Sequence, residues 1–268
     1  MEHSSIKRII LVALTLSLVC SIVVSTAAVG LRPVQKINKQ LDIQSNILQV
    51  VGRYSEGQSD EMTARQMALI EPRIIDLQSG QVLDMNPDDF DFDQVRLNAQ
   101  LSRPLSRDED IAQIKRLPHI MKIYLVKNPD GATEHIVFPI YGYGLWSTLY
   151  GFLAMETNKT TLSGLQFYDH KETPGLGGEV DNPRWRALWK NKRLYDKQGR
   201  LRIAVVRGRA DRYSPDFAYQ VDGLSGATLT SRGVSEMLRF WFGPLAYRNF
   251  LDRFAAASPG KAAPPTKS

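Results

Sequence analysis

The chain has 268 residues, of which 43% are hydrophobic and 23% are charged, and this composition excludes a wholly disordered protein. The formal net charge is +6, but the basic residues are scattered and accompany no zinc-finger or aromatic-rich RNA-binding pattern, which argues against a nucleic-acid-binding protein. The single cysteine, Cys20, excludes an internal disulfide and a cysteine-based metal site, and the four histidines lie too far apart in sequence to form a metal-binding pair.

The first predicted element is a membrane-spanning helix over Ile9–Leu31, which leaves residues 1–8 as a short tail. The stretch contains no charged residue and is long enough to cross a bilayer at about 1.5 Å per residue. A cleaved signal peptide is the alternative, because Lys7 and Arg8 give a basic start and Ser25–Ala27 resembles a cleavage site. The stretch is longer than a usual signal-peptide core, so we expect it to remain as an anchor. Basic residues flank both ends, and the charge bias therefore leaves the orientation open.

Residues 32–257 are predicted to form a mixed α/β domain, followed by a disordered tail over 258–268. Helical periodicity of apolar residues predicts helices at Pro33–Arg53, Ser59–Leu69, Asp108–Arg116, Pro183–Trp189 and Leu229–Phe242. Runs rich in β-branched and aromatic residues predict strands at Arg73–Leu77, Gln81–Leu83, Met121–Val126, His135–Ile140, Leu149–Met155, Thr161–Phe167 and Leu201–Val206. Asn128–Gly131 is typical of a hairpin turn. Helices and strands do not alternate as regular βαβ units, so the predicted fold class is α+β.

The run from Asp222 to Thr230 is the strongest candidate for chemistry. Two small residues, Gly226 and Ala227, precede Thr228 and leave the backbone open to a large planar group or a modifying enzyme. The predicted helix begins at these hydroxyl residues, and its free N–H groups favour a phosphate on or beside Thr228. An ordinary N-cap cluster is one alternative. A hydrolase nucleophile at Ser225 is another, although no histidine follows it and Ala227 replaces the last glycine of that motif.

Two further loops are candidates for ligand contacts. His170–Gly178 places Pro174 among three glycines, so its backbone can approach a ligand closely, and Leu176 can lie against a ring. An ordinary surface turn is the alternative. In Tyr141–Ser147, Trp146 is expected either to cover a ligand or to anchor the core, and its size favours the core.

Taken together, these motifs resemble those of a known family. Asp222–Thr228 resembles the motif at which respiratory subunits carry FMN in phosphodiester linkage to the final threonine. An apolar N-terminal segment, Pro104 followed by Asp108–Asp110, and the motifs Gly144–Ser147 and Glu172–Gly177 occur in the same order. Over nearly its whole length the chain resembles the covalent-FMN subunit of the Na⁺-translocating NADH:quinone oxidoreductase.

The resemblance implies a covalent cofactor and a site for it. A flavin transferase would attach FMN to Thr228, within a motif that also contains Ser225, Gly226 and Ala227. The flavin ring would contact residues of the second loop and of the aromatic turn, namely Glu172, Thr173, Gly175, Leu176 and Trp146. No metal site is implied.

The resemblance also implies a role as a one-electron carrier in a multisubunit membrane complex that passes electrons from NADH toward ubiquinone and exports Na⁺. The chain has no Gly-x-Gly-x-x-Gly loop after a strand, so NAD(H) is expected to bind elsewhere. In similar subunits of the bacterial inner membrane the N-terminus is cytoplasmic, which would place residues 32–257 on the periplasmic side. Two alternatives are the FMN subunit of the related ferredoxin-linked ion-translocating complex and a non-redox, membrane-anchored envelope binding module.

Overall fold

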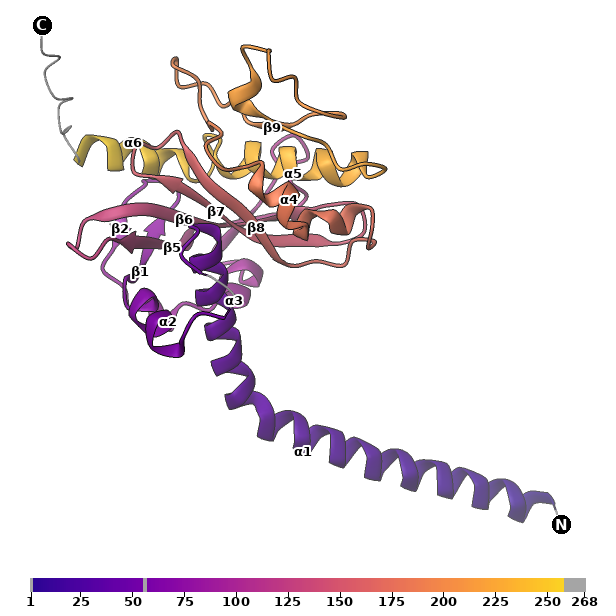
Figure 1. Ribbon diagram of the computed structural model, residues 1–268. Helices are drawn as coiled ribbons and strands as arrows, with labels where there is room; N and C mark the ends of the chain where they lie inside the picture. The colour runs from indigo at the N-terminus through magenta and orange to yellow at the C-terminus, as the bar shows by residue number, and fades with distance from the viewer. Residues whose placement is uncertain (1, 55–56, 258–268) are drawn as a thin grey trace, which may run out of the picture. The chain divides into compact units, whose positions relative to one another are not determined.

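The computed structural model describes residues 2–54 and 57–257 (Figure 1). These residues form two units, with the boundary between Ser45 and Asn46, and each unit is described by itself. The tail predicted over 258–268 lies outside the described residues.

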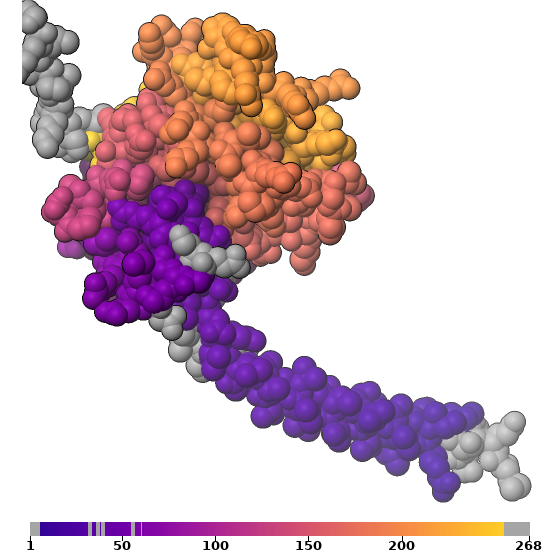
Figure 2. Space-filling model, in the orientation of Figure 1, coloured from indigo at the N-terminus to yellow at the C-terminus, as the bar shows by residue number. Residues whose placement is uncertain are grey.

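The first unit consists of most of helix α1 (Glu2–Val50). Within it, Ile6–Leu31 is long and apolar enough to cross a membrane, and its side chains are exposed along the helix (Figure 2). The predicted N-terminal apolar helix is confirmed. It continues without a break through most of the helix predicted over Pro33–Arg53.

The second unit is built on a six-stranded antiparallel sheet in the order β2-β1-β5-β6-β7-β8. Its strands are β1 (Ile70–Asp76), β2 (Val82–Leu83), β5 (Ile120–Lys127), β6 (Thr133–Tyr143), β7 (Thr148–Glu156) and β8 (Leu162–Asp169). Each corresponds to a predicted strand, and the turn at Asn128–Gly131 joins β5 to β6 as predicted, with Gly131 at φ +83°. The pairing of β6 with β7 runs from His135 opposite Glu156 to Tyr143 opposite Thr148, so the turn Gly144–Ser147 lies at one end of the sheet.

Two C-terminal helices, α5 (Thr228–Trp241) and α6 (Arg248–Ala257), lie along one side of the sheet (Figure 1, yellow). Trp241 is fully buried, and its indole N–H donates a hydrogen bond to the carbonyl of Tyr141 in β6 at 2.7 Å. Large buried aromatic side chains supply much of the packing energy of such a core. The contact between Trp241 and Tyr141 places the end of α5 over β6, while Gly233, nearer the start of α5, packs against Gly144. The start of α5 therefore lies beside the turn after β6.

The last turn of α1 belongs to the second unit. Ile47 and Leu48 are fully buried there. Gly164 in β8 has no room for a side chain, because an ideal Cβ would lie 2.5 Å from the carbonyl oxygen of Val50. The end of α1 is therefore packed directly on β8.

The shorter elements fill the connections between these parts. They are α2 (Asp60–Met67), the 3₁₀ turn η1 (Pro87–Asp89), α3 (Phe92–Leu97), β3 (Ser102–Pro104), β4 (Arg116–Pro118), η2 (Gly177–Asp181), α4 (Pro183–Ala187), β9 (Ala204–Val205), η3 (Phe217–Tyr219) and β10 (Gln220–Val221). The helices predicted at Ser59–Leu69 and Pro183–Trp189 are confirmed. The α+β class and the mixed α/β domain after an N-terminal helix are confirmed as well.

The helix predicted over Asp108–Arg116 is wrong, because these residues form turns that lead into β4. The Asp110 carboxylate accepts hydrogen bonds from the backbone N–H groups of Ile114 and Lys115, which in a helix would bond to backbone carbonyls. Gln113 and Lys115 have φ angles of 53° and 66°, which a helix does not contain. A side chain has replaced the helical hydrogen bonds.

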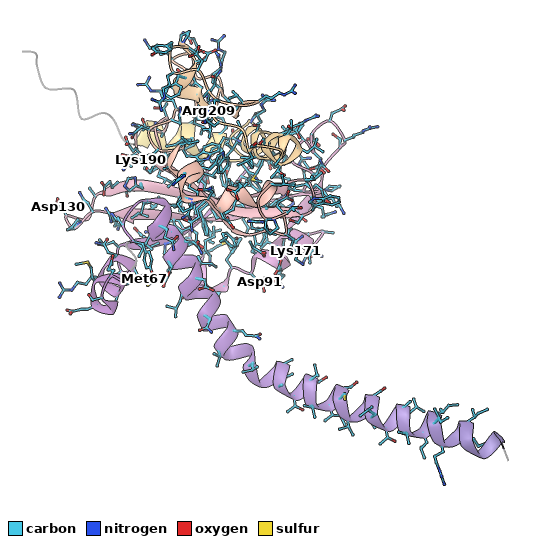
Figure 3. All side chains as sticks on the ribbon, turned by 45° about the vertical axis from the view of Figure 1, so that its right-hand side comes forward. Met67, Asp91, Asp130, Lys171, Lys190 and Arg209 are labelled. Carbon is cyan, nitrogen blue, oxygen red and sulfur yellow. The ribbon has the colours of Figure 1, made fainter. Side chains whose placement is uncertain are left out.

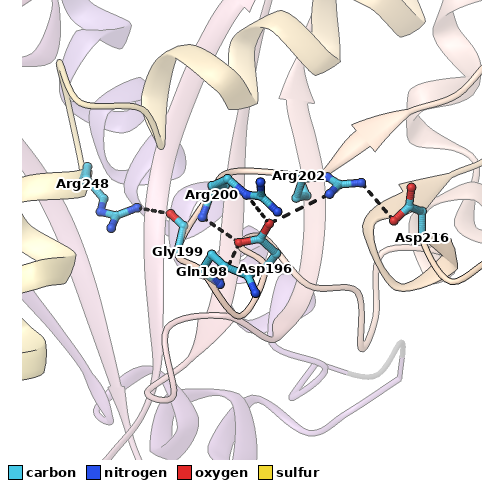
Figure 4. A network of polar contacts seen from close by, with 7 residues as sticks. All are labelled: Asp196, Gln198, Gly199, Arg200, Arg202, Asp216 and Arg248. Atoms are coloured by element: carbon cyan, nitrogen blue, oxygen red, sulfur yellow. Dashed lines mark hydrogen bonds and ion pairs between the residues drawn. The ribbon is translucent and has the colours of Figure 1, made fainter.

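The strand predicted over Leu201–Val206 is reduced to the two residues of β9, which pair in parallel with β10. A polar network fixes the segment before β9 (Figure 4). The buried Asp196 carboxylate accepts bonds from the backbone and the guanidinium of Arg200, while Arg202 pairs with Asp216 at 2.9 Å. Arg248 of α6 donates to the backbone of the same turn at 2.7 Å. These side-chain contacts take the place of the longer strand.

Candidate functional site

The predicted attachment residue, Thr228, is the first residue of α5 and is exposed. Its hydroxyl makes no hydrogen bond with any residue in the described ranges, and Ala227 occupies the cap position without a side-chain cap bond. The N-cap interpretation is therefore wrong for Thr228. Its neighbours Ser225 and Gly226 are also exposed, so the hydroxyl is accessible.

The hydroxyls that follow in α5 point the other way. Thr230 is fully buried, and Ser231 is buried and accepts a hydrogen bond from the backbone N–H of Leu224 at 3.0 Å. That bond connects the start of the Asp222–Thr228 motif to the first turn of α5. The first turn of α5 thus has an exposed side with Thr228 and a buried side with Thr230 and Ser231.

The loop that contains Leu176 meets the motif directly. Gly226 has φ +71°, and an ideal Cβ on it would lie 2.9 Å from a Leu176 methyl carbon. Leu176 itself is half-exposed, and Gly175 before it has φ +75° with open space around it. The two predicted parts of the site, far apart in sequence, are therefore brought together.

Glu172 joins the loops to the helix. Its side chain is buried, and its carboxylate accepts hydrogen bonds from the backbone N–H groups of Leu145 (3.1 Å), Trp146 (2.9 Å) and Ser147 (3.2 Å) and from the Thr230 hydroxyl (2.7 Å). Burial acts to raise the pKa of Glu172, but these hydrogen bonds outweigh burial and hold the pKa below its ordinary value. The group is therefore an ionised carboxylate at neutral pH.

Three glycines make this close packing possible. An ideal Cβ on Gly144 would lie 2.7 Å from the Glu172 carboxylate, and one on Gly177 would lie 2.6 Å from both that carboxylate and the Thr230 hydroxyl. Gly233 of α5 lies against the carbonyl of Tyr143 with no space for a side chain. The backbone of α5 can approach both loops only because these positions lack a Cβ.

Trp146 is 66% exposed, so the interpretation of this residue as a core anchor is wrong. It sits at the tip of the turn held by Glu172. Tyr143, Leu176 and Leu229 are the other large apolar side chains exposed on the segments of this cluster. An exposed tryptophan offers a surface for a flat aromatic ligand.

A cavity of about 360 Å³ lies beside Thr228. The outer face of α5 lines one side with Thr228, Arg232, Glu236 and Arg239, and the segment from Ala204 to Gly208 lines the other. Arg232 pairs with Glu236 at 2.7 Å, whereas Arg207 and Arg239 form no ion pair with any described residue. The cavity thus has three guanidinium groups and one carboxylate, which suits an anion.

Arg207 and Arg232 were not predicted from the sequence to be parts of the site. Arg232 and Glu236 are four residues apart on the predicted helix, a spacing that could have indicated the ion pair. Arg207 carried no such indication, because the loop after β9 also contains Arg209, which Figure 3 labels, and Arg212, and nothing in the sequence distinguishes one arginine from the others.

A second cavity, of about 730 Å³, lies elsewhere in the second unit, between the end of α1, β8 and α4, and none of the predicted site residues lines it. Within residues 2–54 and 57–257, no group of three or more His, Cys, Asp or Glu side chains could hold a metal ion.

Comparison with known proteins bears on this site directly. A family model described as an FMN-binding domain matches residues 144–243, from the turn after β6 to the end of α5. A protein of Yersinia pestis, named as the C subunit of the Na(+)-translocating NADH-quinone reductase, is 45% identical over 253 residues, which cover 94% of each chain. The chain belongs to this family of Na⁺-translocating NADH-quinone reductase subunits, the NqrC family.

Other members of the NqrC family agree with this assignment. The protein of the same name from Pseudomonas aeruginosa is 46% identical over 93% of this chain and 96% of its own length. The crystal structure of NqrC from Shewanella oneidensis matches with a TM-score of 0.74 at 34% identity and covers 82% of this chain and 99% of that one. The fold is therefore that of the NqrC family.

Proposed function

We propose that this chain carries FMN in phosphodiester linkage to Thr228 and acts as a one-electron carrier in a Na⁺-translocating NADH:quinone reductase. The observation that carries the proposal is the state of the Thr228 hydroxyl. It is exposed and makes no hydrogen bond within the described residues, at the start of α5 and inside the matched FMN-binding domain. A hydroxyl in that state is available for modification.

The residues around Thr228 fit the parts of FMN. The phosphate would lie at the N-terminus of α5, where free N–H groups and the helix dipole favour negative charge, with Arg207 and Arg232 in the adjoining cavity. The exposed side chains of Trp146 and Leu176 and the backbone around Gly175 would face the flavin ring. Bound FMN supplies the ability to accept and donate electrons singly, and the protein positions it and tunes its potential.

Attachment requires a co-substrate and an enzyme. In the proposed step, the Thr228 oxygen attacks the FMN phosphorus of FAD, a P–O bond forms, the bond to AMP breaks, and the hydroxyl proton is released as AMP leaves. A flavin transferase would catalyse this exchange. Thr173, Ser225 and Gly226 are exposed and would line the approach to Thr228 and the ring, next to the buried Ala227.

The family and the apolar helix α1 support a proposal for the place of the protein in the cell. Ile6–Leu31 would anchor the chain in the bacterial inner membrane as a single span, with residues 32–257 on the periplasmic side and the other subunits of the complex as partners. The complex would pass electrons from NADH toward ubiquinone and export Na⁺. N-terminal sequencing of the native protein tests the anchor, because a mature chain that begins near Ala28 would indicate a signal peptide.

The proposal is tested by coexpressing the full chain with a flavin transferase. A fluorescent band on a denaturing gel, with an intact mass increased by one FMN phosphodiester, is expected for the wild type and absent for Thr228→Ala. Colourless wild-type protein would favour the non-redox binding module. The ferredoxin-linked alternative is less favoured, because the matched relatives that cover over 90% of this chain are named for the NADH-quinone reductase.

A further inference from the structure

The Glu172 carboxylate is fully engaged by protein groups. It receives three backbone N–H bonds from Leu145, Trp146 and Ser147 and one hydroxyl bond from Thr230, and the residue is 5% exposed. A carboxylate has about four acceptor sites, so none is left for a ligand. Contact between this carboxylate and a flavin ring is therefore unnecessary to explain why an acidic residue is buried here.

Glu172 and its hydrogen-bond partners belong to three segments of the candidate site. Leu145–Ser147 is the turn that presents Trp146, Glu172 itself begins the loop that presents Leu176, and Thr230 lies two residues after Thr228 in the same helical turn. Gly144 and Gly177 leave space for the carboxylate and for nothing larger. One buried side chain thus joins all three segments.

Nearby polar contacts hold the loop in the same arrangement. The backbone N–H of Lys171 donates to the Ser147 hydroxyl at 2.7 Å, and His170 pairs with Asp181 at 2.8 Å. The backbone N–H of Glu172 donates to the other ring nitrogen of His170 at 3.2 Å. The backbone that leads into Glu172 is therefore fixed, so Glu172 cannot turn toward solvent without breaking several bonds.

We propose that Glu172 is the positioning residue of the flavin site, which acts through Thr230 and the Gly144–Ser147 turn and supplies a fixed negative charge beneath Trp146. The inference rests on the proposed function, because it assigns a role toward the FMN on Thr228. Removing the charge should favour reduced flavin, which is more negative than oxidised flavin. Removing the bond to Thr230 should loosen the start of α5 relative to the surface on which the ring docks.

The two effects are separated by near-isosteric variants of the full chain, each coexpressed with a flavin transferase. Glu172→Gln keeps acceptors for the backbone N–H groups but removes the charge, and its flavin midpoint potential is expected to shift in the positive direction. Thr230→Val removes only the hydroxyl donor, and iodide is expected to quench its flavin fluorescence more strongly. Thr230→Ser keeps the hydroxyl and should restore wild-type quenching.

Tyr247→Phe is the matched control, because it also removes one buried hydroxyl bond, from Tyr247 to the carbonyl of Pro139 at 2.6 Å, away from the flavin site. It should change neither the potential nor the quenching. The inference is overturned if Glu172→Gln and Thr230→Val, with full covalent flavin by mass, match the wild type in both measurements. Wild-type protein without covalent flavin would instead overturn the proposed function.

Discussion

The two sides of the first turn of α5 carry similar residues and do opposite things. On the exposed side, Thr228 has a free hydroxyl beside Gly226 and a cavity with guanidinium groups. On the buried side, the Thr230 hydroxyl donates a hydrogen bond to the Glu172 carboxylate, and the Ser231 hydroxyl accepts one from the backbone N–H of Leu224. Successive residues of a helix point in different directions, so a run of hydroxyl residues at a helix start does not face one way. Here the Thr228 hydroxyl faces outward, whereas the Thr230 and Ser231 hydroxyls face inward and fix the helix start in position.

The largest effect is expected at Thr228, where a substitution should abolish flavin attachment and leave the stability of the protein unchanged. Thr228→Val removes the hydroxyl without breaking any hydrogen bond to a described residue, so covalent flavin should be lost while the melting temperature of the flavin-free protein stays within about 2 °C. Intact mass and thermal melts of protein made without flavin transferase measure the two. A variant that keeps flavin would place the linkage on Thr230 or Ser225.

Gly177→Ala should disturb the buried hydrogen bond between Glu172 and Thr230 and leave the exposed Thr228 hydroxyl unchanged. The new methyl group would need to displace the Glu172 carboxylate or the Thr230 hydroxyl, each 2.6 Å away, at a cost of about 2–3 kcal/mol. Urea unfolding measures the change. Gly178→Ala is the control one residue further on, where the nearest atom is 3.1 Å away, and it should cost less. Equal losses of unfolding free energy in the two variants would mean that the Glu172 carboxylate does not limit the space at position 177.

The buried side should also depend on pH. The pKa of Glu172 is lowered in the folded state, so its bonds stabilise the protein above pH 4.5, the ordinary value, and this contribution is lost as pH falls through the folded-state pKa. The unfolding free energy of the wild type should exceed that of Glu172→Gln by about 1–2 kcal/mol at pH 7 and approach it in acid. Urea titrations between pH 7 and pH 3 check this, and a constant difference would contradict it.

Gly175 lies in the exposed part of the Glu172–Gly177 loop. Its substitution should lower the unfolding free energy only through backbone strain. Gly175→Ala places a Cβ at φ +75°, which costs about 1 kcal/mol, but meets no atom within 4 Å. Gly131→Ala, at φ +83° and equally open, is the matched control in the β5–β6 turn and should cost the same. If the flavin ring packs on the Gly175 backbone, Gly175→Ala alone should also shift the midpoint potential, whereas a surface turn would leave it unchanged.

Trp146 should give the smallest change in stability. Because the side chain is 66% exposed, Trp146→Ala should alter the unfolding free energy by no more than about 0.5 kcal/mol. Stacking of the indole on the ring would quench flavin fluorescence, so the folded variant should be brighter than the wild type and Trp146→Phe intermediate. Unchanged brightness would remove Trp146 from the flavin site.

Local patterns in the sequence were sufficient for the apolar N-terminal helix, the strands of the large sheet, the hairpin at Asn128–Gly131 and the helix that begins at Thr228. Each depends on the periodicity or turn chemistry of a short segment. The helix predicted at Asp108–Arg116 failed because the Asp110 side chain bonds the backbone locally, which periodicity does not reveal. Helix α6 was not predicted at all.

The family motifs in the sequence identified Thr228, Glu172 and Leu176, but only the tertiary structure decided what each is placed to do. Whether a hydroxyl is free or bonded depends on groups distant in sequence, and Glu172 reaches Thr230 across 58 positions. The exposure of Trp146 and the gathering of guanidinium groups in the cavity beside Thr228 also depend on segments that are distant in sequence. Sequence periodicity determines which face of an element is apolar, whereas burial and hydrogen bonding of one side chain are set by the neighbours that the fold brings to it.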